Sequence, residues 1–233
     1  MKKQISYPKI QQFRNIVSTI RRQSDFVGLD ENDEAIYDKL KVKPTLKFKG
    51  TVKLHGTNAA VCYNELGGLW FQSRTRIITQ EKDNAGFAFF GESKNEFFLY
   101  MFEYLSNKYS VNLKENTISI YGEWCGGNIQ KGVALNQLEK SFFIFGSKVT
   151  PHDESDSYWL DISKDGLSVG KENIYDINDF PTYEVEINFN NPELIQNQLI
   201  EITNRVEKQC PVALEFGKIG IGEGVVWTCE YNG

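Results

Sequence analysis

The sequence predicts an α+β fold rich in strands, because its hydrophobic period changes along the chain. Between Leu46 and Leu54, apolar residues alternate with lysine and threonine, which is typical of a half-buried strand. From Pro8 to Arg22 and from Lys94 to Tyr109, apolar residues instead recur at helical spacing. We therefore predict sheets with flanking helices, the first helix starting at Pro8.

The remaining elements follow in order along the chain. Further strands are predicted over residues 58–63, 68–72, 117–124, 141–149 and 224–231. The run Asn191-Pro192-Glu193 predicts a helix start with Asn191 as N-cap, and Cys210-Pro211 predicts the end of that helix. No repeat or linker interrupts the chain. We expect one domain over residues 1–233, in which residues 1–45 are a helical N-terminal extension without a usable motif.

Composition excludes several classes of protein. Of 233 residues, 40% are hydrophobic, which excludes a disordered chain, and a net charge of -5 excludes a generic polycationic nucleic-acid binder but not a local basic groove. The N-terminus has no apolar signal-like region, and no stretch is long and apolar enough for a membrane span. We expect a soluble monomer in the cytoplasm (the host cytoplasm if a phage encodes it), without a membrane partner. The four cysteines show no zinc-site spacing, and we expect buried free thiols.

The stretch KLHGTN, residues 53–58, is the first candidate for chemistry. Lys53 lies at the end of a predicted strand, directly before a His-Gly turn. A lysine held there and partly removed from water can act as a nucleophile, whereas a solvated charge or a phosphate clamp explains it equally well. The glycine permits a close backbone approach, and Thr57 and Asn58 can bond a ligand or the turn itself. The stretch alone does not decide between these alternatives.

Four other segments carry candidate functional side chains. Glu123 follows a strand among glycines and can accept a hydrogen bond from a ligand, and Arg74 follows another strand and can meet a phosphate. In SFFIFGSKV, Phe143 and Phe145 share one face, and a ring that faces a cleft can stack on a base for about 1–3 kcal/mol. Glu223 leads an apolar strand, where an acid is either solvated or directed at a metal. Each also has an ordinary structural explanation.

Taken together and in order, these segments resemble the motifs of the covalent nucleotidyltransferases: ATP-dependent DNA ligases, RNA ligases and mRNA capping enzymes. The His-Gly-Thr-Asn variant is most similar to phage-type nick-sealing RNA ligases and RNA-editing ligases. The resemblance implies a nucleotidyltransferase domain, ATP-grasp-like, built on twisted, mainly antiparallel sheets. The matching segments are Lys53–Asn58, Ser73–Thr75, Gly122–Glu123, Ile129–Val133, Phe142–Phe145 and Glu223–Val226.

The resemblance also implies a role for each position. Lys53 would attack the α-phosphate of ATP and carry AMP, which then passes to an RNA 5′-phosphate before a 3′-OH seals the strand. The cofactors would be ATP and Mg²⁺ or Mn²⁺, and the partner an RNA with 5′-phosphate and 3′-OH ends, expected as a nicked duplex. The implied contacts are Phe145 with adenine, Glu123 with ribose, Leu54, Asn58 and Arg74 with the nucleotide, Glu223 with nucleotide and metal, and Lys131 with RNA.

Three departures from the family pattern keep alternatives open. The expected Lys-x-Lys motif after Glu223 is absent, Gly146 stands where many relatives have an acid, and Thr228 stands where several have lysine. The first predicts a truncated chain or a natural variant with impaired chemistry. The alternatives are a DNA ligase or capping nucleotidyltransferase of the same superfamily, and a non-catalytic nucleotide- or RNA-binding fragment.

Overall fold

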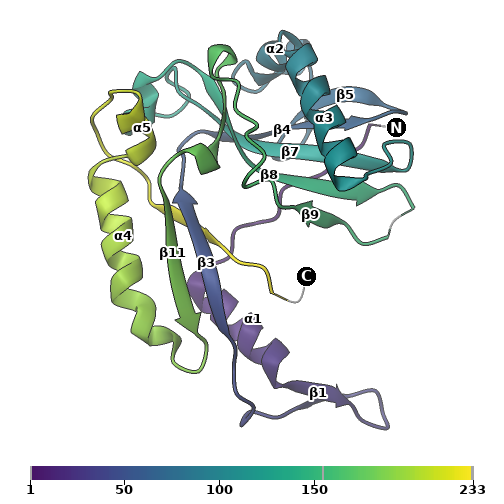
Figure 1. Cartoon of the computed structure of the whole chain (residues 1–233), viewed down its shortest axis with the longest axis vertical. Coiled ribbons are helices and arrows are strands. Elements are labelled where there is room, and N and C mark those ends of the chain that lie inside the picture. Colours follow the sequence, from purple (N-terminus) through teal and green to yellow (C-terminus); the bar gives the residue numbers. More distant parts are fainter. Residues whose placement is uncertain (1, 154, 232–233) are drawn as a thin grey trace.

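The larger sheet forms the upper body of the molecule in the computed structural model, which describes residues 2–153 and 155–231 (Figure 1). All its strand pairs are antiparallel except the parallel pair of β10 and β8. The strands predicted over residues 58–63, 68–72, 117–124 and 141–149 are thereby confirmed. The spatial order of the strands in this sheet is β10 (Ile174–Asp176), β8 (Ser141–Pro151), β7 (Asn116–Cys125), β4 (Thr57–Asn64), β5 (Gly68–Ser73) and β6 (Ile77–Ile78). Strand β9 (Tyr158–Leu160) pairs with β8.

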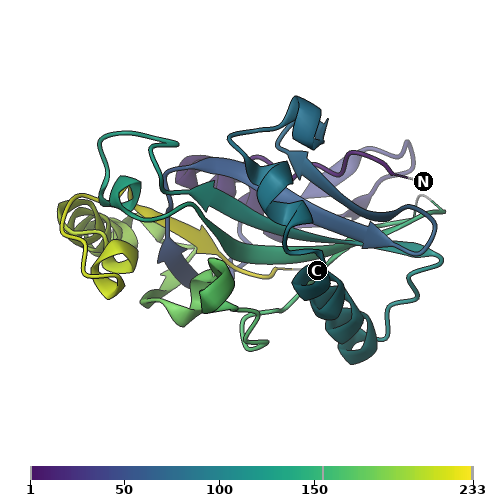
Figure 2. The same cartoon turned by 90° about the horizontal axis from the view of Figure 1, so that it is seen from above.

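The two faces of this sheet are covered differently. Helices α2 (Phe87–Glu92) and α3 (Asn95–Tyr109) pack on one face, where Ala59 and Val61 of β4 point into the main core. Figure 2 shows α3 lying against that side of the sheet. The alternate residues of β4, Ala60 and Cys62, point to the other face, and there they meet Ile5 of the N-terminal segment. The residues that precede the helix predicted from Pro8 therefore cover this second face of the sheet.

A smaller antiparallel sheet forms the lower arm of the molecule. Its order is β11 (Thr182–Asn188), β3 (Thr45–Val52) and β12 (Val225–Thr228), so the predicted strand at 46–54 is confirmed and the one at 224–231 is shorter. Helices α1 (Phe13–Asp25) and α4 (Gln196–Lys208) pack against it. The upper end of β3 reaches the larger sheet, where Val52 and Leu54 share a core with Phe143 (Figure 1).

Two predicted helix starts differ from the structure, and one predicted helix end agrees with it. The first helix begins at Phe13 instead of Pro8, because Ile5 is tied to the large sheet and holds the preceding residues extended. The side chain of Asn191 makes no cap hydrogen bond, and a 3₁₀ turn over Pro192–Ile195 precedes α4. The end predicted at Cys210-Pro211 is confirmed, because α4 ends at Lys208, and Pro211 then opens a further short helix, α5 (Pro211–Glu215). Other 3₁₀ turns are η1 (Gln80–Lys82), η2 (Ala134–Gln137), η3 (Gly170–Glu172) and η4 (Ile177–Asp179).

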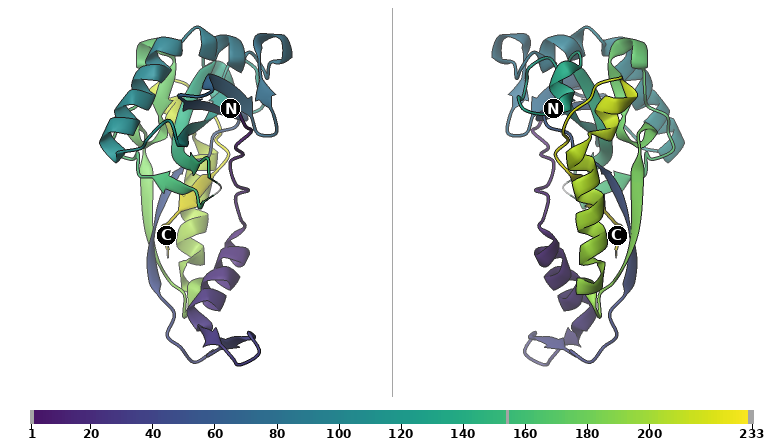
Figure 3. Two further views of the ribbon diagram at one scale, coloured as in Figure 1. Left: turned by 90° about the vertical axis from the view of Figure 1, so that its right-hand side faces the viewer. Right: turned by 90° about the vertical axis from the view of Figure 1, so that its left-hand side faces the viewer.

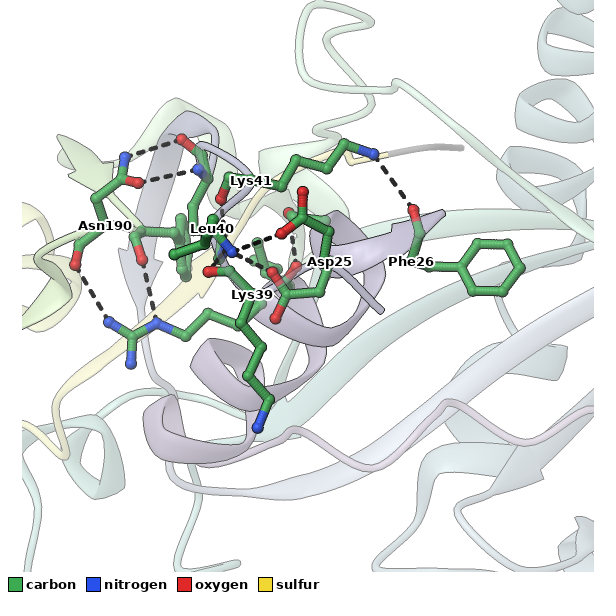
Figure 4. Close-up of polar contacts among 12 residues, drawn as sticks. Asp25, Phe26, Lys39, Leu40, Lys41 and Asn190 are labelled. Atoms are coloured by element: carbon green, nitrogen blue, oxygen red, sulfur yellow. Dashed lines mark hydrogen bonds and ion pairs between the residues drawn. The ribbon is translucent and has the colours of Figure 1, made fainter. Parts of the chain in front are cut away.

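Residues 26–37 form a hairpin that the sequence analysis did not predict, with strands β1 (Phe26–Leu29) and β2 (Ala35–Tyr37). Figure 4 shows how its base is fastened. Lys43 forms an ion pair with Asp25 at 2.5 Å, and the side chain of Asn190 bonds both the N–H and the carbonyl of Lys43 at 3.0 Å. Lys41 donates to the carbonyl of Phe26 at 3.2 Å. These contacts attach the hairpin to the end of the small sheet.

Two further expectations concern the whole chain. Cys62, Cys125 and Cys210 are buried free thiols as predicted, while Cys229 is half-buried. Within residues 2–153 and 155–231, none of the helices has the length and apolar character that crossing a membrane requires.

Candidate active site

A pocket of about 570 Å³ lies where the two sheets meet, a volume in the range of small-molecule sites. It is bordered by the C-terminal ends of β3, β5 and β7, the N-terminal end of β4, the strand β12 and the middle of β8. The structure brings into its lining all seven residues to which the sequence assigned a nucleotide role: Lys53, Leu54, Asn58, Arg74, Glu123, Phe145 and Glu223.

Lys53 and Glu223 face each other because β3 and β12 pair antiparallel. Val52 lies opposite Val225, and just beyond this pair the N–H of Lys53 donates to the carbonyl of Gly224 at 2.9 Å. The Nζ of Lys53 forms an ion pair with Oε1 of Glu223. The side chain of Lys53 is still 44% exposed, so the amine remains accessible from the pocket while it is paired.

The second oxygen of Glu223 is also engaged. Its Oε2 lies 3.2 Å from Nδ1 of His55, the residue two places after the lysine. The carboxylate therefore links the end of β3 to the turn that follows it. A ligand or cation that approaches Glu223 has to compete with Lys53 and His55 for these oxygens.

Gly56 allows the turn after β3 to lie flat on β7. A Cβ atom at this position would be 2.4 Å from the carbonyl oxygen of Trp124 and 2.6 Å from Cβ of Cys125, which no larger residue tolerates without displacement. The Gly56 N–H donates to Oε1 of Glu123 at 3.1 Å, and the Gly56 carbonyl accepts from Gln130 at 3.4 Å. The glycine of the His-Gly pair thus places the turn in contact with Glu123, the residue predicted to contact the ribose.

Glu123 is held in an environment that favours its protonated form. Burial raises the pKa of its carboxyl to about 7, and the negative charge of Glu223 adds to this effect. The Gly56 N–H and the positive charges of Lys53 and Arg74 act in the opposite direction but are weaker than burial. In register Glu123 lies directly opposite Asn58 on the neighbouring strand, so both side chains reach the pocket from one face.

Phe145 reaches the pocket because of a β-bulge. In the pairing of β7 with β8, Tyr121 lies opposite Gly146 and Gly122 lies opposite Ile144, so Phe145 has no partner across the ladder. Such an extra residue bends the strand and redirects its side chain. Phe143 is fully buried in the core between the sheets, whereas Phe145 is half-buried at the pocket. Phe145 is therefore the one of these two rings that can face a ligand.

Arg74 completes the ring of predicted residues. Ser73, the last residue of β5, pairs with Ala59 of β4, and this places Arg74 beside Asn58 at the pocket edge. The carbonyl of Arg74 accepts from Ser6 at 3.3 Å and from Gln4 at 3.4 Å. The loop that carries the arginine is therefore supported by the N-terminal segment.

The sequence analysis missed one wall of the pocket. Tyr7, Pro8, Lys9 and Ile10 line it, although residues 1–45 were expected to carry no functional motif. No local signal marked this wall, because an extended residue before proline is equally compatible with a helix that starts at Pro8. Lys131 does not line the pocket. It is exposed on the loop after β7, next to Gln130, which bonds the Gly56 turn.

Comparison with known proteins agrees with this geometry. A family model described as RNA ligase matches residues 47–232. The chain belongs to the RNA ligase family. None of the curated protein sequences matches this RNA ligase family member.

Solved structures of a Naegleria gruberi RNA ligase have the same fold. The structure with PPi is 16% identical with a TM-score of 0.55, and it aligns with 97% of this chain and 52% of its own. A variant with ATP and Mn is also 16% identical, with a TM-score of 0.54 and coverage of 97% and 53%. The chain therefore spans about half the length of these relatives. At this identity the likeness establishes the nucleotidyltransferase fold, α+β with mainly antiparallel sheets.

Proposed function

We propose that this chain is the adenylyltransferase part of an ATP-dependent RNA ligase. The observation that carries the proposal is the convergence of Lys53, two carboxylates, an arginine and an aromatic ring on one pocket. These are the groups that phosphoryl transfer requires, since it depends on positioning and charge neutralisation. The Naegleria structures with ATP and Mn and with PPi are consistent with ATP as substrate. We further propose that residues 1–233 act as one such domain, because residues 7–10 contribute a pocket wall.

In the proposed first step, Lys53 gives up a proton and its Nζ attacks the α-phosphorus of ATP. A nitrogen–phosphorus bond forms, the bond to pyrophosphate breaks, and AMP remains on the lysine as a phosphoramidate. Phe145 is proposed to stack on the adenine, Glu123 to bond the ribose, and Asn58, Arg74 and the backbone at Leu54 to hold the sugar and phosphates. In the absence of nucleotide, the pairing of Lys53 with Glu223 holds the amine at the pocket.

Glu223 is the proposed ligand of a divalent metal, Mg²⁺ or Mn²⁺. Its carboxylate faces the pocket, and within the described residues no group of three or more His, Cys, Asp or Glu forms a protein cage. A site with one carboxylate, completed by substrate phosphates and water, fits Mg²⁺, which commonly keeps several waters. When bound, the metal would neutralise phosphate charge and compete with the Lys53 ammonium for Glu223.

In the later steps an RNA 5′-phosphate oxygen attacks the same phosphorus and the lysine amine leaves. A 3′-OH then attacks the 5′-phosphate and AMP departs. We propose a nicked duplex as the substrate, with the loop that carries Lys131 on its path. That loop touches the Gly56 turn through Gln130, which supports a location beside the pocket.

Intact-mass spectrometry after incubation with ATP and Mg²⁺ tests the first step. We expect the chain to gain one AMP and the Lys53→Ala variant to gain none. Lys47→Ala is the matched control, since Lys47 is an exposed lysine of the same strand outside the pocket, and it should gain AMP like the unaltered chain. An adduct that persists in Lys53→Ala would refute the assignment of the nucleophile.

Three further assays separate the alternatives. Labelling from GTP in place of ATP would indicate a capping nucleotidyltransferase. A preference for all-DNA nicks over RNA or mixed nicks in a sealing assay would indicate a DNA ligase. Binding of ATP without any adduct would indicate a non-catalytic nucleotide-binding module.

A further inference from the structure

The N-terminal segment, residues 2–10, lies on the face of the large sheet from which the pocket opens. We name it the strap. Figure 3 shows it as a purple trace that runs along the outside of the molecule from the N-terminus to α1. The RNA ligase family model matches only from residue 47, so the strap lies outside the matched segment. Four of its residues nevertheless line the pocket: Tyr7, Pro8, Lys9 and Ile10.

Buried hydrogen bonds fix the middle of the strap. The N–H of Ile5 donates to Oε1 of Gln72 at 3.1 Å, and Nε2 of Gln72 donates back to the carbonyl of Ile5. The hydroxyl of Tyr121 donates to the same carbonyl at 2.9 Å. Gln72 and Tyr121 are themselves almost fully buried, so these bonds lie away from water and their loss would leave unsatisfied polar groups. The strap is therefore part of the folded unit.

Tyr7 connects the strap to the base-stacking side of the pocket. Its ring centroid lies 5.0 Å from that of Phe145, 5.2 Å from Tyr121 and 5.5 Å from Trp159, each in an edge-to-face arrangement. This geometry is favourable between aromatic rings. Phe145 lies on a bulge without a partner across the ladder, so its ring depends on such side-chain neighbours for its orientation.

Gly146 makes room for this arrangement. The resemblance leads to an expected acid at this position, but a Cβ there would already lie 3.6 Å from the ring of Trp159 and 4.0 Å from that of Tyr7. A carboxylate at this position would extend among these rings, where the Nζ of Lys148 also lies 5.6 Å from the centroid of the Trp159 ring. The absence of a side chain at Gly146 thus leaves the space beside the rings of Tyr7 and Trp159 open.

We propose that the strap completes the nucleotide site and that Tyr7 is a positioning residue, which orients Phe145 for stacking on the base. The proposal rests on the proposed adenylyltransferase function. The strap also supports the opposite wall, because Ser6 and Gln4 donate to the carbonyl of Arg74. It therefore couples the aromatic and the cationic sides of the pocket.

A double-mutant cycle on AMP affinity, measured by calorimetry, tests this role. Tyr7→Ala should weaken AMP binding about three- to tenfold, the value of one edge-to-face aromatic contact, and Tyr7→Phe should restore it because the ring is kept. In a Phe145→Ala background, Tyr7→Ala should cause no further loss, because Tyr7 acts through that ring. Tyr158→Ala, an exposed aromatic of β9 outside the pocket, is the matched control and should bind AMP normally.

Several outcomes would overturn the proposal. Losses that add in the double variant would mean that Tyr7 acts independently of Phe145, and equal losses in Tyr7→Phe and Tyr7→Ala would assign the effect to the hydroxyl. A second measurement requires no variant: AMP should slow hydrogen exchange of the amides in residues 5–10. If Tyr7→Ala lowers the melting temperature strongly, this measurement decides, and unchanged exchange refutes the proposal.

The strap and the ligase function fail in different ways. If the unaltered chain forms an AMP adduct on Lys53 but the Tyr7→Ala variant binds AMP with normal affinity, the proposed role of the strap is refuted and the ligase proposal stands. If AMP affinities follow the predicted double-mutant cycle but no AMP adduct forms, the proposed role of the strap is supported and catalysis by this chain is refuted. If the unaltered chain neither binds AMP nor forms an adduct, both proposals fall.

Discussion

Replacing Glu123 by glutamine should change how the stability of the fold depends on pH. Burial raises the pKa of this carboxyl from its ordinary value of 4.5 to about 7. Between these two values the folded chain binds a proton that the unfolded chain does not bind. The free energy of unfolding therefore falls as pH rises through this window, and the contribution is fully retained below pH 4.5.

The size of this effect follows from the pKa. Each tenfold change in proton affinity corresponds to about 1.4 kcal/mol, so ionising Glu123 in the fold costs about 3 kcal/mol. Glutamine has the shape of the protonated acid, and its Oε1 can still accept from the Gly56 N–H. The Glu123→Gln variant should exceed the stability of the unaltered chain by less than about 1 kcal/mol at pH 5 and by about 3 kcal/mol at pH 8.

Urea unfolding from pH 5 to pH 8, without nucleotide or divalent metal, measures this difference. Other titrating groups, such as the buried Asp176, act alike in both chains and cancel in the comparison. A stability difference that stays constant over the whole range would show that Glu123 ionises normally in the fold. The argument from burial would then be wrong.

Two other predictions concern the turn after β3 and the loop after β7. Gly56→Ala should destabilise the fold by about 1–3 kcal/mol, because the added methyl meets the Trp124 carbonyl, and urea unfolding that matches the unaltered chain would contradict this. Lys131→Ala should leave the AMP adduct unchanged, weaken binding of nicked RNA and reduce the slope of log affinity against log salt by about one. An unchanged salt slope would remove Lys131 from the RNA path.

The candidate site was largely readable from the sequence because its chemistry is carried by short local motifs. Lys53, Glu123 and Glu223 each stand in a recognisable local pattern, and the resemblance of these ordered segments to the nucleotidyltransferase motifs implies that they share one nucleotide site. The strand predicted from the alternation in residues 46–54 and the helix predicted from the spacing in 94–109 are also confirmed, since both patterns reflect burial of one face. Boundaries were less accurate where a tertiary contact overrides local preference, as at Pro8.

What only the tertiary structure decided depends on contacts between distant residues. The bulge that turns Phe145 towards the pocket exists in the register of two strands, and the raised pKa of Glu123 arises from burial where two sheets meet. The wall built by Tyr7 depends on Gln72 and Tyr121, which lie more than sixty residues away. Residue types and their local spacing determine which chemistry is available, whereas long-range pairing determines where each side chain points and what surrounds it.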